Sequence, residues 1–136
     1  MRDSRAEALR WLRQAENDLA FARLALRERF FAHACFVAQQ TAEKALKAVA
    51  YGLGERVVLG HSLVELVDGL AGRAPALAAL RQQAGLLDQY YVATRYPNGL
   101  PGGVPFEAFS AGQAEEAVAE AARFVDAARG AIDAPG

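Results

Sequence analysis

The amino-acid sequence predicts an all-α protein, an antiparallel four-helix bundle with one additional short helix. Three segments have the form of a capping box, in which a serine that opens a helix is followed three residues later by Glu or Gln. Apolar residues, many of them alanine, then recur at alternating steps of three and four. No segment shows the strict apolar–polar alternation that is typical of a β-strand. We expect the whole chain, residues 1–136, to form one domain.

The first capping box, at Ser4, predicts a helix with one apolar face. That face consists of Ala8, Leu12, Ala15, Leu19, Ala22 and Leu26. Beyond residue 29 the same stripe would place polar and charged side chains in the core, and the sequence starts a stripe of different phase instead. The new stripe consists of Phe31, Cys35, Ala38, Ala42, Leu46, Val49 and Leu53. The change of phase predicts a second helix from about Phe31, with Gly52 and Gly54 suited to end it.

The remaining helices have equally local start signals. A capping box at Ser62 opens a short third helix, and Pro75 suits the first turn of a fourth. The apolar stripe of this fourth helix consists of Leu77, Leu80, Ala84, Leu87 and Tyr91. It cannot run past Thr94, because prolines and glycines predict an irregular loop over residues 95–109. The last capping box, at Ser110, opens the final helix.

Alanines on the inward faces allow helix axes to approach closely, which suits an antiparallel bundle with short connections. The stripes also predict which larger side chains are fully buried. These include Cys35, Leu46, Leu87 and Phe124.

Composition limits the function classes. A net charge of −1 argues against a protein whose entire surface binds nucleic acid. The single cysteine cannot form an internal disulfide, and no apolar run approaches the roughly 20 residues of a membrane helix. The charged N-terminal segment is unlike a signal peptide. We therefore expect a cytoplasmic protein without a membrane partner.

No motif nominates a metal, a cofactor or a catalytic residue. Neither His33 nor His61 follows a glutamate by three residues, as the ligands of di-iron bundles do, and no Cys/His spacing suits zinc. The sequence lacks a P-loop and a dinucleotide-binding fingerprint. No base is placed beside a serine or Cys35 to activate a nucleophile.

Two segments combine residues that suit an anionic ligand. In the second helix, Lys44 and Lys47 share one side. They form either a cationic surface or a solvated face with a Glu43–Lys47 pair. After the fourth helix stripe, Tyr90 and Tyr96 could stack on a base and Arg95 could bind phosphate. The structural alternative places the aromatic residues in the core and Arg95 at the last helix carbonyls. We expect one face, built from both segments, to bind an anionic ligand.

These segments, in order and spacing, resemble the HEPN domain family. Residues 36–48 resemble its second helix, residues 60–63 with Leu66 the start of its third, and residues 87–91 with 94–97 the end of its fourth. The resemblance implies a helical bundle. It also implies one of two activities: metal-independent RNA cleavage by an Arg-x4-6-His motif in a dimer, or non-catalytic binding beside a minimal nucleotidyltransferase.

The sequence departs from the ribonuclease pattern, because no histidine follows Arg95. Arg56 and His61 have the right spacing but lie in the predicted loop between the second and third helices, and we interpret that match as chance. The resemblance therefore implies a non-catalytic homodimer that binds nucleotide, RNA or a minimal nucleotidyltransferase, as in some toxin–antitoxin pairs. Two alternatives stay open: a ribonuclease with an atypical site around Arg56, His61 or Arg95, and a helical interaction module without a small ligand.

Overall fold

In a computed structural model that describes residues 3–133, every regular element is helical, which confirms the predicted fold class. The three long helices are α1 (Ser4–Arg27), α2 (Phe31–Gly52) and α8 (Ala111–Asp133). The shorter elements are α3 (Leu63–Leu70), α4 (Pro75–Ala78), α5 (Arg81–Asp88), α6 (Tyr90–Ala93), the 3-10 turn η1 (Pro97–Gly99) and α7 (Pro105–Ala108). Within this part of the chain, no helix is both long and apolar enough to cross a membrane.

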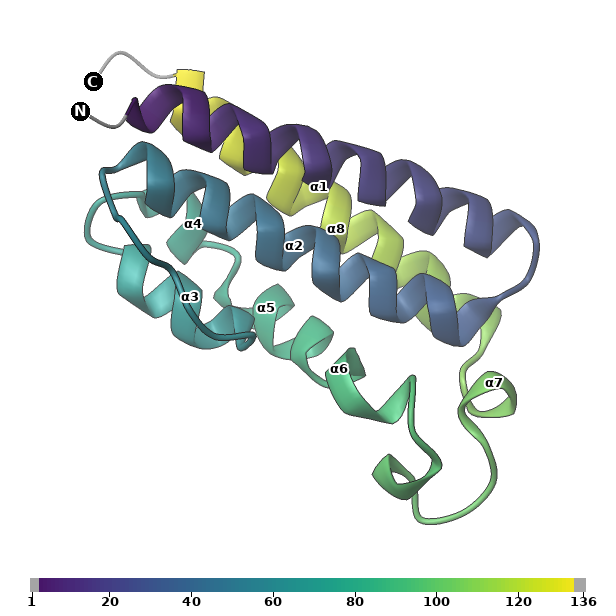
Figure 1. The fold of residues 1–136 in the computed structure, drawn as a ribbon. Coiled ribbons are helices and arrows are strands. Elements are labelled where there is room, and N and C mark those ends of the chain that lie inside the picture. The colour runs from purple at the N-terminus through teal and green to yellow at the C-terminus, as the bar shows by residue number, and fades with distance from the viewer. Residues whose placement is uncertain (1–2, 134–136) are drawn as a thin grey trace.

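The long helices pack against one another, and the short ones cover the open side of α2. The helices α1 and α2 form an antiparallel hairpin, and α8 packs against both (Figure 1). The series α4, α5 and α6 runs antiparallel to α2 and α8 and completes the bundle, while α3 packs on α5 (Figure 1). The result is the antiparallel bundle with one extra short helix that the sequence predicts.

The predicted break between the first two helices is real, although neither glycine nor proline marks it. Arg29 adopts the left-handed conformation there, with φ of 67°, and is the one described residue besides glycine with positive φ. The amide of Phe30 then donates to the carbonyl oxygen of Ala25 at 2.8 Å, a bond that closes a helix end. The Arg29 guanidinium lies over the ring of Phe31 at 5.2 Å. The chain thus reverses where the apolar stripe changes phase.

Of the three predicted capping boxes, one is complete, one is confirmed only as a serine cap, and one is wrong. At the start of α8 the side chains and amides of Ser110 and Gln113 bond reciprocally at 2.9 and 3.1 Å. At α3, Ser62 is the cap, and its hydroxyl accepts the amide of Glu65 at 3.3 Å. At α1, however, the cap is Asp3 and not Ser4, because the Asp3 carboxylate accepts the amide three residues later at 3.1 Å. A carboxylate serves this position at least as well as a hydroxyl.

The prediction of one continuous fourth helix from Pro75 to Thr94 is wrong. The segment is divided into α4, α5 and α6, and at Leu80 the backbone leaves helical geometry (φ −100°, ψ 12°). The breaks change the phase of the apolar stripe: Leu77, Leu80, Ala84 and Leu87 are buried as predicted, but the next residue in the core is Tyr90 and not Tyr91. The loop over residues 95–109 is also more regular than predicted, since Pro97 and Pro105 each begin one helical turn.

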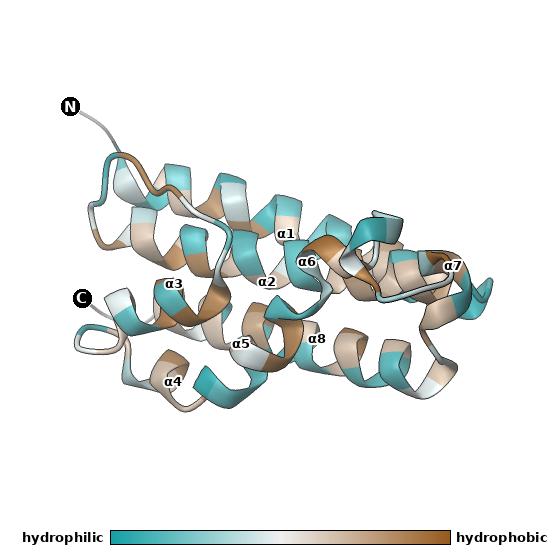
Figure 2. Ribbon diagram, turned by 90° about the horizontal axis from the view of Figure 1, so that it is seen from below, coloured by the Kyte–Doolittle hydropathy of each residue, from teal (hydrophilic) through white to brown (hydrophobic). Residues whose placement is uncertain are grey.

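The core lies between the three long helices and the short helices that cover them, where hydrophobic residues face inward (Figure 2). Many of its side chains are alanine. The four side chains predicted to be fully buried all have zero exposure: Cys35, Leu46, Leu87 and Phe124. Burial raises the pKa of the Cys35 thiol to about 12, so its sulfur stays protonated at neutral pH. At the ends of the predicted stripes, Leu53 is exposed, and Ala25 is more deeply buried than Leu26.

We expect Leu46→Ala to lower the free energy of unfolding by about 2–5 kcal/mol, because it leaves a cavity in this core. Leu59→Ala is a matched control, since Leu59 is 81% exposed and should cost less than about 1 kcal/mol. Urea unfolding followed by circular dichroism measures both. A loss below about 1 kcal/mol for Leu46→Ala would show that this face of α2 is not the core face.

Candidate functional site

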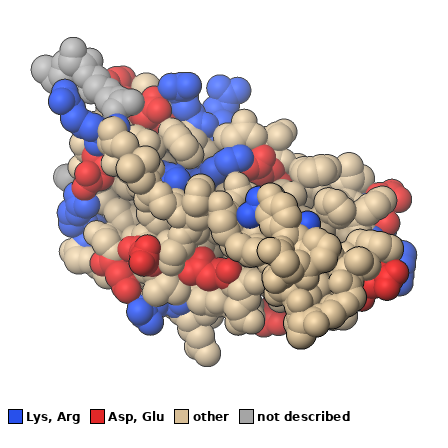
Figure 3. Space-filling view, turned by 60° about the horizontal axis from the view of Figure 1, so that its bottom comes forward, with Lys and Arg blue, Asp and Glu red and all other residues tan. Residues whose placement is uncertain are grey.

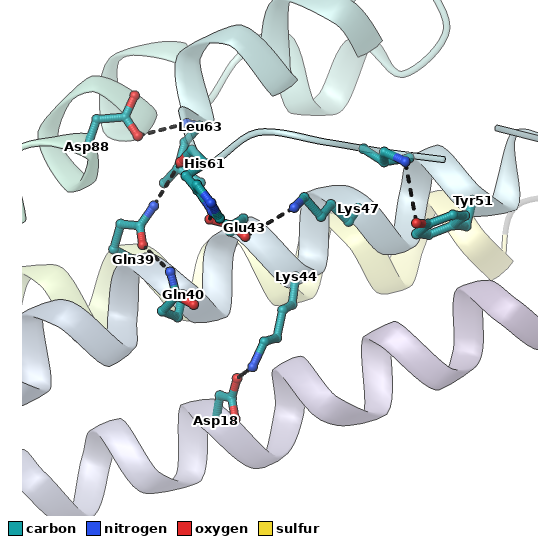
Figure 4. A network of polar contacts seen from close by, with 11 residues as sticks. Asp18, Gln39, Gln40, Glu43, Lys44, Lys47, Tyr51, His61, Leu63 and Asp88 are labelled. Carbon is teal, nitrogen blue, oxygen red and sulfur yellow. Dashed lines mark hydrogen bonds and ion pairs between the residues drawn. The ribbon is translucent and has the colours of Figure 1, made fainter. Parts of the chain in front are cut away.

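A stripe of polar side chains runs along α2 on the side that faces the loop over residues 53–62. Gln39, Glu43, Lys47 and Tyr51 are spaced by four residues, so they lie one above the other on a helix (Figure 4). All four are buried, with exposed fractions between 0% and 8%. Buried polar groups need partners, and the loop that covers the stripe supplies several of them.

The loop is bonded to the stripe at three places. The Gln39 side-chain amide donates to the carbonyl oxygen of His61 at 3.0 Å, and the Glu43 carboxylate lies 3.0 Å from His61 Nδ1. In the middle of the loop, the amide of Val58 donates to the Tyr51 hydroxyl at 3.4 Å. These bonds position His61 over the middle of α2.

Glu43 is a buried carboxylate shared by two partners. Its Oε2 lies 3.2 Å from Lys47 Nζ, and its Oε1 is the atom that faces His61. The ammonium of Lys47 compensates the buried charge. An ionised carboxylate can only accept hydrogen bonds, so the hydrogen of a neutral His61 ring lies on Nδ1. In that neutral ring the other nitrogen, Nε2, is an acceptor, whereas a protonated ring would donate from both nitrogens; the side chain is 57% exposed.

A second carboxylate fixes the backbone next to His61. Asp88, at the end of α5, accepts the amide of Leu63 at 2.7 Å (Figure 4). It also accepts the amide of Val64 and the hydroxyl of Ser62, both at 3.1 Å. These amides belong to the first turn of α3, where a negative charge also suits the helix dipole. The residue after His61 is thereby tied to the series α4–α6, while His61 itself is tied to α2.

An aromatic cluster continues from His61 to the end of α6. The rings of His61 and Tyr91 stack at 4.8 Å between centroids with 19° between planes. The Arg95 guanidinium lies 4.7 Å from the same Tyr91 ring, 4.4 Å from Phe36 on α2 and 5.1 Å from Tyr96. The Nε of Arg95 donates to the Tyr91 carbonyl oxygen at 2.9 Å. Three rings and one backbone bond thus hold the cation in place.

The chain after Arg95 folds back against α6. A Cβ at Gly99 would come within 2.9 Å of the Ala93 Cα, so this approach requires glycine. A pocket of about 490 Å³ opens here, and its lining includes His61, Asp88 and Tyr91. The His61 and Tyr91 end of the cluster therefore borders a shallow, open depression, whose lining does not include Arg95.

The structure brings only some of the predicted site residues together. Lys47 and Arg95 belong to one continuous set of contacts through Glu43, His61 and Tyr91. The second helix and the end of the fourth do converge, as the sequence reading supposed.

Lys44 and Tyr90 lie apart from this set. Lys44 points to the other side of α2, where it forms an ion pair with Asp18 on α1 (Figure 4). Tyr90 is only 5% exposed, and its ring contacts Phe109 edge-on at 5.7 Å between centroids. Burial also raises the pKa of Tyr90. Its ring is thus not available to stack on a base, whereas Tyr96 is 51% exposed.

Because the Arg56–His61 spacing is interpreted as chance from the sequence, the partners that orient His61 were not predicted. The spacing of four residues from Gln39 to Tyr51 was the available signal, since such a polar stripe on a helix that is otherwise buried requires a cover. The charge of the surface gives little further guidance. Figure 3 shows the face formed by α3 to α7. Basic and acidic side chains are interspersed on it, and a wide area of it carries no charge.

Comparison with known proteins identifies a matching family and similar structures. Residues 8–131 match the sequence profile of the HEPN domain. A crystal structure of a protein from Thermus thermophilus is 35% identical with a TM-score of 0.87, over 92% of this chain and 98% of that one. An archaeal HEPN homologue is 33% identical with a TM-score of 0.78, over 93% and 98% of the two chains. A HEPN domain protein from Thermotoga maritima is 31% identical with a TM-score of 0.56, over 90% and 91%. No curated protein matches the sequence significantly.

We expect Asp88→Ala to lower the free energy of unfolding by about 1–3 kcal/mol, because it removes a helix cap and leaves amides unpaired. Hydrogen exchange of the Leu63 and Val64 amides should accelerate. Asp68→Ala is the control, since Asp68 forms only an exposed ion pair with Arg81 and should change stability far less. Equal effects of the two substitutions would show that Asp88 does not anchor the loop.

Proposed function

Because the chain belongs to the HEPN family, we propose that it binds the phosphate of a nucleotide or of RNA through Arg95, without catalysing a reaction. The observation that carries the proposal is the state of the Arg95 guanidinium. It is held by three rings and one carbonyl oxygen, and within residues 3–133 no carboxylate forms an ion pair with it.

A guanidinium in this state is suited to bind an anion. Its Nε is already bonded, so the two terminal nitrogens are left to donate in the fork geometry that matches phosphate oxygens. The rings hold the side chain in one place, so binding costs little of its conformational entropy. By contrast, Lys44 and Lys47 each have a carboxylate partner, and we assign Lys47 the role of holding Glu43.

Tyr96 is suited to contact the base of the same ligand. Its ring is 51% exposed and lies beside the guanidinium. Stacking of a base on an aromatic side chain contributes about 1–3 kcal/mol and tolerates any base. The chain has a net charge near zero, so the attraction for phosphate depends on this local arrangement and should weaken as salt rises.

The proposal includes an assembly. We expect a homodimer that pairs with a minimal nucleotidyltransferase, in a system of the toxin–antitoxin kind, as the family resemblance implies. Exposed apolar side chains at the turn between α1 and α2 support an interface with another protein. They are Phe21, Leu24 and Phe30. Sedimentation of the purified protein tests the dimer, and co-purification tests the nucleotidyltransferase.

A second candidate function is RNA cleavage by an atypical site. The observation that favours it is that His61 and Arg95 contact the same Tyr91 ring, while a carboxylate orients His61. An oriented imidazole that shares one ring contact with a guanidinium supplies the two kinds of group that such a reaction needs, a general base and a phosphate ligand. His61, one of the two residues in the Arg56–His61 spacing, is thus oriented by a carboxylate and an aromatic ring, which the sequence alone does not predict.

Arg95→Ala should weaken binding of ATP, a dinucleotide or short RNA by about tenfold or more, because a charge-assisted hydrogen bond is lost. Lys44→Ala is the matched control: it also removes one positive charge, but on the α1 side, and should change affinity less than about twofold. Fluorescence anisotropy at low and moderate salt measures both. Equal affinities of wild type and Arg95→Ala would contradict the proposal.

Purified protein without partners should leave short RNA intact over hours, because the sequence lacks the family's histidine after Arg95. Denaturing gels of labelled RNA measure this. Cleavage that disappears in both His61→Ala and Arg95→Ala would favour the ribonuclease instead. Cleavage that survives both substitutions would point to a contaminant.

A further inference from the structure

We propose that an apolar hollow at one end of the bundle binds a small aliphatic carboxylate, with Arg5 and Arg73 holding the carboxylate and the hollow taking the chain. The hollow lies where α1 begins and where α2 and α8 end, beside α4 (Figure 1). Neither Arg95 nor His61 lines it, so this site is separate from the proposed phosphate site.

The hollow has the size and the lining of a small-molecule site. Its volume is about 630 Å³, and such sites commonly have about 300–1,000 Å³ with a mostly apolar lining. Much of the lining consists of small residues, which leave space between α2, α4 and α8. They are Gly52, Ala74, Ala76, Ala127, Gly130 and Ala131. Larger apolar side chains, those of Val49, Leu53 and Ile132, complete it. An aliphatic chain that enters the hollow removes its own apolar surface and that of the lining from water.

The charges of the lining select the head group. Among the described residues that line the hollow, only Arg5 and Arg73 are charged. Each already binds a carboxylate that lies outside the lining, Arg5 that of Asp133 at 3.4 Å and Arg73 that of Glu55 at 3.1 Å. All four side chains are 45% to 61% exposed, and exposed ion pairs contribute little to stability. A ligand carboxylate can therefore replace either partner at a small cost.

The helix ends at the hollow do not outweigh these cations. The carbonyl groups that end α2 and α8 carry partial negative charge, which disfavours an anion nearby. At the end of α2, however, the amides of residues 53–55 donate to carbonyl oxygens of the last turn. At the end of α8, Arg5 donates to the carbonyl oxygen of Ile132 at 3.0 Å. These bonds reduce the repulsion, and the two guanidinium groups favour an anionic head group over a neutral or cationic one.

The test titrates the protein with octanoate, 1-octanol and octylammonium, which share one chain and differ in the charge of the head group. Two-dimensional NMR of the backbone amides measures the affinity and locates the ligand. Octanoate should shift the amides of Gly52 and Gly130 and bind about threefold to tenfold more tightly than 1-octanol, with octylammonium weaker still. From hexanoate to decanoate, each added methylene should tighten binding about twofold to fourfold.

One variant tests the hollow itself. Gly130→Leu places a larger side chain there, because a Cβ at Gly130 meets no atom within 4 Å, and it should weaken octanoate binding at least tenfold. Gly112→Leu, in the first turn of the same helix, is the control and should leave the affinity unchanged. Leucine suits a helix better than glycine, so both variants should fold, which circular dichroism checks.

A second variant tests the charges. Arg5→Gln/Arg73→Gln should bind octanoate and 1-octanol equally, with the affinity that wild type has for 1-octanol. Arg10→Gln/Arg123→Gln is the matched control, since it also removes two guanidinium groups from exposed ion pairs, neither of them at the hollow. It should keep the preference for octanoate.

The comparison of head groups uses wild type, so it decides the matter even if a variant fails to fold. Equal binding of octanoate and octylammonium, or amide shifts that lie away from the hollow, would overturn the proposal. So would the absence of saturable binding at millimolar octanoate. If sedimentation then showed self-association that Gly130→Leu abolishes, a second copy of the chain would be the occupant instead.

Discussion

The carboxylate of Glu43, buried on α2 between Lys47 and His61, is the constraint on which the arrangement of this site depends. A charge in the interior is tolerated only when it is paired and hydrogen-bonded, and removal of a partner from such a pair costs several kcal/mol. Lys47 is supplied by the helix itself, four residues on. His61 comes from a separate segment, so the loop over residues 53–62 has to close over α2 before the carboxylate is satisfied.

Two further interactions make this closure specific. The Gln39 side chain donates to the His61 carbonyl oxygen, and Asp88 caps α3 directly after it. The Glu43 carboxylate thus orients the His61 imidazole, while the Asp88 carboxylate fixes the backbone next to His61. Gly54 and Gly60, with φ of 99° and 100°, allow the chain to turn at either end of the loop, a conformation that other residues adopt at a cost. His61 is accordingly held more firmly than its exposure alone would suggest.

The predictability of the fold and of the site differed for physical reasons. Helix starts at Ser62, Pro75 and Ser110 depend on atoms within one turn, so local sequence was sufficient. The continuity of the fourth helix depends on how a short segment fits against α2 and α8, and local periodicity predicted a straight helix where the structure bends. The cap at Asp3 shows the limit of a motif: a neighbouring carboxylate occupied the position that the pattern assigned to a serine.

By itself, the sequence determined that the protein is a helical bundle, where most helices begin, which side chains form the alanine-rich core, and that cationic and aromatic residues lie on α2 and after α6. Only the tertiary structure decided what those residues do. Lys44 and Lys47 are three positions apart on one helix, yet one pairs with Asp18 on α1 and the other holds Glu43 beneath the loop. The reason is that periodicity follows from the geometry of a single helix, whereas the partner of a charge is set by groups that approach through space from distant parts of the chain.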